Sequence, residues 1–127
     1  MEITQEHILK VVIEHLSSEE IAKSTICWDT RIRMKGEDLV IGPQKIPMPF
    51  DGYMIFVDLA PQANWAHPCL YLLLSRGIQE ITRIKASFPP YWGEYPESYK
   101  VLLRYGERPP HDRYFTPFDE PTKRERR

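Results

Sequence analysis

Residues 51–75 read DGYMIFVDLAPQANWAHPCLYLLLS, and the two apolar runs in this stretch decide the fold. The first run covers residues 53–59, the second covers 69–75, and a nine-residue loop separates them. Short apolar runs bounded by turn residues are typical of strands that are buried on both faces. Because the connection is short, the stretch predicts two neighbouring antiparallel strands that form the centre of a sheet.

Upstream of this pair, residues 25–34 alternate with a period of two. One face would carry Ile26, Trp28, Thr30, Ile32 and Met34, and the other Cys27, Asp29, Arg31 and Arg33. This pattern predicts a strand with one face toward the core and the other in solvent. A turn at 35–38, where Gly36 can adopt a positive φ, predicts a hairpin to a second strand at 39–41. Residues 44–50 contain two prolines and predict an edge or an extended crossing, and residues 79–88 predict a fifth strand.

Helical patterns stand at both ends of the chain. An apolar stripe predicts a helix over residues 5–16 with Thr4 as its N-cap. Ser17 and Glu20 form a capping-box pattern, which predicts a second short helix over 18–24, with one longer helix that bends there as the alternative. Near the other end, a proline before residue 97 and a glycine after residue 105 predict a short helix over 97–105, with a strand as the alternative.

The predicted fold class is α+β: an N-terminal helix in two pieces packs on an antiparallel sheet of about five strands, followed by a short C-terminal helix and an extended tail. We expect one domain over residues 1–106 and a tail over 107–127. The order of one helix and then an antiparallel meander is similar to the cystatin-type layout. The resemblance concerns architecture alone and implies no function.

Composition excludes several classes of function. The chain has 17 Lys and Arg against 18 Asp and Glu, for a net charge of −1, which argues against a nucleic-acid binder. The apolar runs are shorter than the roughly 20 residues that a membrane span needs, so we expect no membrane. With two cysteines and no secretory leader, we expect a cytoplasmic protein with reduced thiols.

The loop between the central strands holds the pattern with the most chemistry, His67-Pro68-Cys69. A neighbouring imidazole can lower the pKa of a thiol and make it a nucleophile. His67 would be the base, Cys69 the nucleophile and Asp58, at the end of the preceding strand, the group that orients the imidazole. A buried structural thiol is the alternative.

Metal binding has little support in the spacing of the possible ligands. Cys27, His67, Cys69 and His111 form no CxxC or HxxxH pattern. From spacing alone we expect no metal site and no cofactor.

Aromatic residues cluster in the proline-rich loops and the tail. The predicted binding residues are Asn64, Trp65, Tyr91, Trp92, Tyr95, Tyr114, Phe115 and Phe118. Aromatic side chains anchor interfaces because they bury a large area at low entropic cost. The leading hypothesis is a non-enzymatic module that binds a protein partner or a copy of itself. The alternatives are a thiol-dependent enzyme or thiol sensor that uses Cys69, and a small-ligand pocket between the first helix and the sheet.

Overall fold

A computed structural model describes residues 4–61, 66–90 and 96–107. Within these ranges the chain forms two helices and seven strands. In chain order they are α1 (Gln5–Glu14), α2 (Ser18–Lys23), β1 (Thr25–Arg33), β2 (Asp38–Ile41), β3 (Gln44–Pro47), β4 (Gly52–Asp58), β5 (Cys69–Ser75), β6 (Ile81–Ala86) and β7 (Tyr99–Leu103). No helix in these ranges is long and apolar enough to cross a membrane.

The N-terminal helix is in two pieces, as the sequence predicts. The Thr4 hydroxyl accepts a hydrogen bond from the His7 N–H and caps α1. Ser17 and Glu20 form the predicted capping box at the start of α2, each side chain accepting from the other's backbone N–H. These caps satisfy backbone donors that a helix start otherwise leaves without partners, so each helix has a defined first residue.

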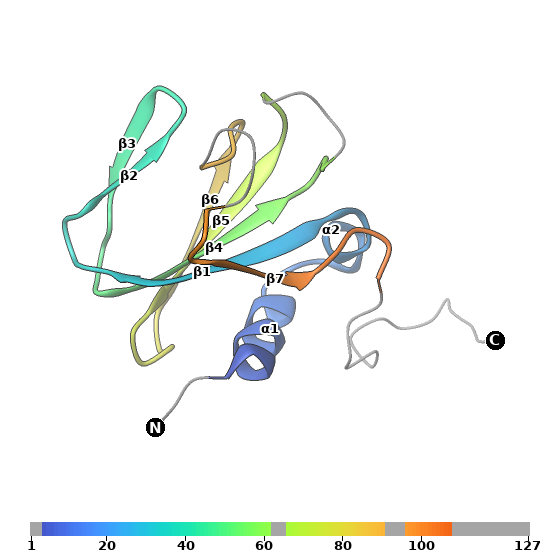
Figure 1. Cartoon of the computed structure of the whole chain (residues 1–127), viewed down its shortest axis with the longest axis horizontal. Coiled ribbons are helices and arrows are strands. Elements are labelled where there is room, and N and C mark those ends of the chain that lie inside the picture. The colour runs from blue at the N-terminus through green and yellow to red at the C-terminus, as the bar shows by residue number, and fades with distance from the viewer. Residues whose placement is uncertain (1–3, 62–65, 91–95, 108–127) are drawn as a thin grey trace.

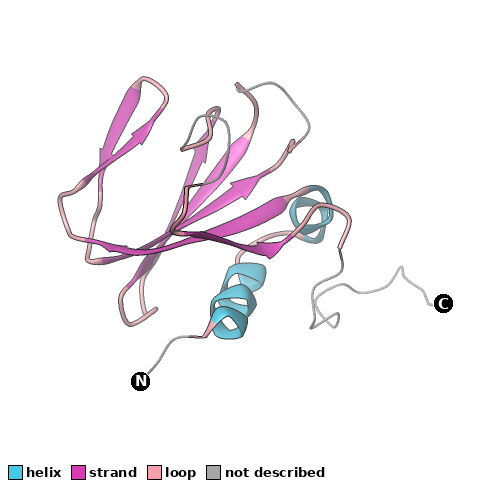
Figure 2. Ribbon diagram, viewed as in Figure 1, coloured by secondary structure: helices cyan, strands magenta, loops and turns pink. Residues whose placement is uncertain are grey.

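A five-stranded antiparallel sheet forms the centre of the molecule, in the order β6-β5-β4-β1-β7, and β2 and β3 form a separate two-stranded sheet (Figures 1 and 2). The pairing of β4, β5 and β6 confirms the predicted meander of neighbouring strands. The predicted hairpin from β1 to residues 39–41 is wrong, because β2 pairs with β3 and not with β1.

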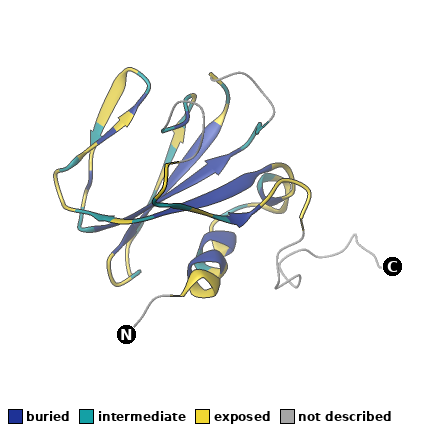
Figure 3. Cartoon of the chain, in the orientation of Figure 1, coloured by how far each residue is buried: buried dark blue, intermediate teal, exposed yellow. Residues whose placement is uncertain are grey.

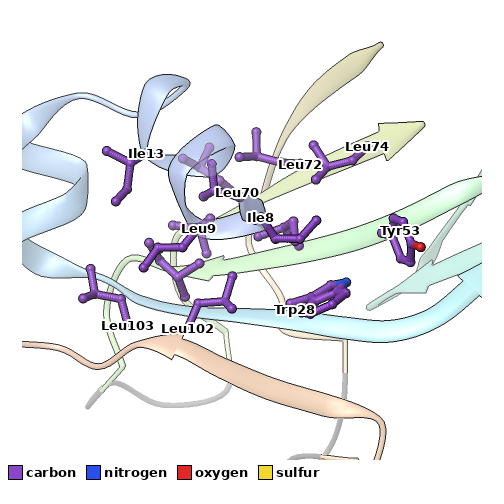
Figure 4. Packing of buried hydrophobic residues seen from close by; sticks show 14 of the residues in the cluster. Ile8, Leu9, Ile13, Trp28, Tyr53, Leu70, Leu72, Leu74, Leu102 and Leu103 are labelled. Carbon is purple, nitrogen blue, oxygen red and sulfur yellow. The ribbon is translucent and has the colours of Figure 1, made fainter. Parts of the chain in front are cut away.

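The first core lies between α1 and the sheet (Figure 4). The apolar stripe of α1 packs against Ile26 and Trp28, which confirms the predicted contact between that stripe and this face of β1. Trp28 also stacks edge-on against Tyr53, with 5.8 Å between the ring centroids. Because side chains from the helix and four strands bury one another here, this interface is a filled core.

The second core covers the opposite face of the sheet, where the β2–β3 hairpin lies (Figure 1). Leu39, Ile41 and Met48 pack against Phe56 and Tyr71 of the central strands. The tip of this hairpin comes so close to the segment after β6 that a Cβ on Gly42, at φ +58°, would lie 2.4 Å from the Phe88 ring. The hairpin thus packs on this face of the sheet, and all seven residues of both β4 and β5 are buried, as predicted (Figure 3).

This second layer corrects the prediction that one face of β1 is in solvent. Cys27 is fully buried and Asp29 is 1% exposed, and only Arg31 of that face is exposed. Asp29 is accommodated because it accepts hydrogen bonds from the Arg33 guanidinium (2.7 Å), the Ser98 hydroxyl (2.7 Å) and the Arg31 N–H (3.1 Å). A buried carboxylate with three such donors is a fully paired group rather than a solvated one.

The predicted helix over 97–105 is wrong, because its central residues form the strand β7. β7 pairs with β1, with a register shift between Ile26 and Cys27. Tyr99 and Val101 face the second core, while Leu102 and Leu103 belong to the first. Pairing with the open edge of β1 satisfies the backbone better than an isolated short helix could.

Candidate functional site

The candidate site lies at one end of the five-stranded sheet, which we call the site end. The strand positions that mark it are Thr25, Asp58, Cys69, Ala86 and Leu103. The opposite end, marked by Arg33, Gly52 and Ser75, is called the far end.

Strand register brings the three predicted catalytic residues together. Asp58 ends β4, Cys69 begins β5, and the two are direct cross-strand partners. Side chains at such positions stand on the same face of the sheet, about 4.5–5.5 Å apart at Cβ. His67 precedes Cys69 by two residues, and its N–H donates to the Ser87 carbonyl at 2.9 Å, which fastens the loop beside the end of β6.

The three side chains form a tight and nearly buried cluster. The His67 Nε2 lies 2.8 Å from the Asp58 Oδ1, and these side chains are 7% and 8% exposed. The Ala60 N–H donates to the same Asp58 oxygen at 3.0 Å, which holds the carboxylate in place. Asp58, His67 and Cys69 each offer one atom that could bind a metal ion, and these three atoms all lie within 4.8 Å of one another.

The state of the Cys69 thiol weighs against a nucleophile. Its Sγ–H donates to the His67 backbone carbonyl at 3.2 Å, so the thiol hydrogen is directed at the main chain. Burial, and then the nearby Asp58 carboxylate, raise the pKa of Cys69 to about 12. A reactive thiol needs the opposite surroundings, electropositive and partly open to solvent. The roles of base, nucleophile and orienting group therefore remain a hypothesis that this geometry disfavours.

The predicted binding residues lie outside the described ranges: Asn64, Trp65, Tyr91, Trp92, Tyr95, Tyr114, Phe115 and Phe118. The described residues that flank those segments are nonetheless informative. His67 adjoins Ser87, and the Tyr71 hydroxyl donates to the Phe88 carbonyl at 2.6 Å. The chain beyond β7 also leaves from this end, where the Tyr105 N–H donates to the Thr25 hydroxyl at 3.0 Å.

Sequence reasoning missed one exposed aromatic residue at this end, Tyr105, which is 54% exposed. The prediction of a helix over 97–105 counted it as part of that element. The signal in the sequence is its position directly before Gly106, because glycine favours turns and turns lie at the surface.

Comparisons with protein-family models, with curated proteins and with solved structures gave no match for this chain.

Proposed function

We propose that this protein is a non-enzymatic interaction module that binds a protein partner, or a second copy of itself, at the site end. The observation that carries the proposal is the joining of three segments there. The loop after β4, the segment after β6 and the chain after β7 all connect to this end through strand pairs or hydrogen bonds. The predicted aromatic anchors belong to these three segments.

The rest of the described surface offers fewer alternatives. Both faces of the central sheet are covered, one by the helices and one by the β2–β3 hairpin. Large exposed apolar side chains of the described residues are three: Met34, Val40 and Tyr105. Tyr105 is the one of these at the site end, and a tyrosine is among the residues that most often carry binding energy.

A thiol-dependent activity has less support, because the Cys69 thiol is buried and its pKa is raised. A ligand pocket between α1 and the sheet has less support too, because side chains fill that interface. A reducing, cytoplasmic setting is part of the proposal, and it fits two buried cysteine thiols.

A matched pair of variants tests the proposal. Tyr105 and Met34 are both 54% exposed, but Met34 follows β1 at the far end. Self-association is measured by light scattering of the full chain, of a chain ending at Gly106, and of Tyr105→Ala and Met34→Ala. A photo-crosslinking residue is placed at position 105 or at position 34, and the protein that it captures is identified. That partner is then purified and titrated against the wild type and each variant.

The expected result is that crosslinks form from position 105 and that Tyr105→Ala weakens binding about tenfold, the usual effect of losing an anchor worth 1–2 kcal/mol. Met34→Ala should leave the affinity unchanged. A protein that stays monomeric at all concentrations, with no crosslink specific to position 105, would contradict the proposal.

A further inference from the structure

The donor atoms of Asp58, His67 and Cys69 form a set that the interaction proposal does not use. Together they offer a carboxylate oxygen, an imidazole nitrogen and a thiol sulfur, all within 4.8 Å of one another. From this geometry we infer a binding site for a metal ion of intermediate softness, Zn²⁺ in particular, held by these three side chains. The inference departs from the expectation of no metal site, which rested on sequence spacing.

The distances are close to those that zinc requires. Zinc bonds of about 2.0–2.1 Å to nitrogen and oxygen and about 2.3 Å to sulfur, in tetrahedral geometry, place the ligand atoms about 3.3–3.6 Å apart. In the structure His67 Nε2 lies 2.8 Å from Asp58 Oδ1, and the two most distant ligand atoms of the cluster lie within 4.8 Å of each other. Side-chain movements of roughly an ångström therefore convert the cluster into three ligands.

The choice of metal follows from the donor types. A sulfur ligand disfavours Mg²⁺ and Ca²⁺, which prefer oxygen alone, whereas mixed sulfur, nitrogen and oxygen sets suit zinc. Binding replaces the Sγ–H of Cys69 by an Sγ–Zn bond, and the proton passes to solvent. The hydrogen between His67 Nε2 and Asp58 also leaves Nε2, and the neutral ring then carries its hydrogen on Nδ1. Three protein ligands leave the fourth tetrahedral position to water, as in sites that are not purely structural.

Surrounding contacts already hold the ligands in place. The Ala60 N–H fixes the Asp58 carboxylate, and the Ser87 carbonyl fixes the His67 backbone. Cys69 stands on β5, which is hydrogen-bonded on both sides, by β4 and β6. The cluster also lies just below the surface, since the residues on either side of His67 are exposed, so an ion has a short path to it.

The test uses the full chain, freed of metal with a chelator and then titrated with Zn²⁺ against a coloured competing chelator. Co²⁺ is titrated in parallel, because a cobalt–thiolate bond gives a charge-transfer band that other ligands do not. We expect one ion per chain and that band. Cys69→Ser, His67→Gln and Asp58→Asn should each weaken zinc binding by at least about 100-fold, as loss of a direct ligand should exceed the 10–100-fold typical of outer contacts.

Cys27→Ser is the matched control, because Cys27 is also a buried thiol on the same face of the sheet but lies outside the cluster. It should leave the stoichiometry and the cobalt band unchanged. Circular dichroism establishes that each variant is folded. The inference is overturned if the wild-type chain gives no thiolate band with cobalt, a result that needs no variant, or if Cys69→Ser binds zinc as tightly as the wild type does.

Discussion

Removing the Asp29 carboxylate should destabilise the fold more than any change to a surface ion pair. Asp29 is 1% exposed and accepts from three groups: the Arg33 guanidinium, the Ser98 hydroxyl and the Arg31 backbone N–H. Through Ser98 it ties β1 to the start of β7. In Asp29→Ala the Arg33 side chain, 13% exposed, loses its nearest counter-charge.

The size of the effect follows from this burial. Breaking a buried ion pair by removing one partner costs about 3–5 kcal/mol, because a charge is left without compensation. Glu37 lies 3.7 Å from the Arg33 guanidinium and offsets part of that cost. We therefore expect the lower end, about 3 kcal/mol, which is a large fraction of the 5–15 kcal/mol typical of a whole domain.

The assay is urea unfolding followed by tryptophan fluorescence and circular dichroism. The control is Arg31→Gln, which removes an exposed ion pair with Glu37 and should cost less than about 1 kcal/mol. The double variant Asp29→Ala/Arg33→Met should cost less than the sum of its single changes, because no charge is stranded. If Asp29→Ala cost no more than the Arg31→Gln control, the assignment of a buried, fully paired carboxylate would be refuted.

Three further predictions concern other parts of the molecule. Gly52→Ala should lower the free energy of unfolding by at least about 2 kcal/mol in thermal unfolding, because the new Cβ would lie 1.9 Å from a β5 carbonyl oxygen. Gly77→Ala is the control and should be nearly neutral, because no atom lies closer than 3.9 Å to its Cβ. Equal effects would contradict the close pairing of β4 and β5. A hydrogen bond from Arg83 lowers the pKa of Glu20 below its ordinary 4.5, so this pair stabilises the fold above pH 4.5 and the stabilisation is lost as the pH falls through the lowered pKa. Arg83→Gln should therefore flatten the acid limb of a stability–pH curve at low salt, and an unchanged limb would count against the pair; high salt should reduce the difference, because Arg83 is 37% exposed. Iodoacetamide should leave Cys69 unlabelled in the native, metal-free protein near pH 7, since burial raises the pKa of this thiol to about 12; rapid labelling there would revive the thiol-enzyme hypothesis.

The parts of the fold that the sequence predicts well are those where local pattern and burial agree. The unbroken apolar runs of β4 and β5 predict strands covered on both faces, and both are fully buried. The stripe of α1 and the Ser17–Glu20 capping box likewise place the helices before any tertiary contact is known.

The errors arise where a distant segment decides the outcome. Alternation in β1 placed Asp29 in solvent, because nothing nearby in the sequence reveals that the β2–β3 hairpin folds back over this face. A carboxylate can be buried there only because Arg33 and Ser98 supply donors. Residues 97–105 carry helix-like end signals, but the free edge of β1 recruits them as β7, so tertiary pairing overrides local preference.

For the site, adjacency could be foreseen better than chemistry. Placing His67 two residues before Cys69, and Asp58 at the end of the preceding strand, is sufficient to predict that they lie near one another. Whether the thiol is a nucleophile or a potential ligand depends on its burial and on the direction of its hydrogen bond. Neither the burial of the thiol nor the direction of its hydrogen bond can be predicted from the neighbouring residues in the sequence.

The most direct measurement is a crystal structure of the full chain grown with zinc, with anomalous diffraction recorded on either side of the zinc absorption edge. We predict a single anomalous peak at the site end, from a zinc ion bonded to the Asp58 carboxylate, the His67 imidazole and the Cys69 sulfur, with β4 and β5 paired beneath it. A structure in which these three side chains point apart, with no peak between them, would contradict it.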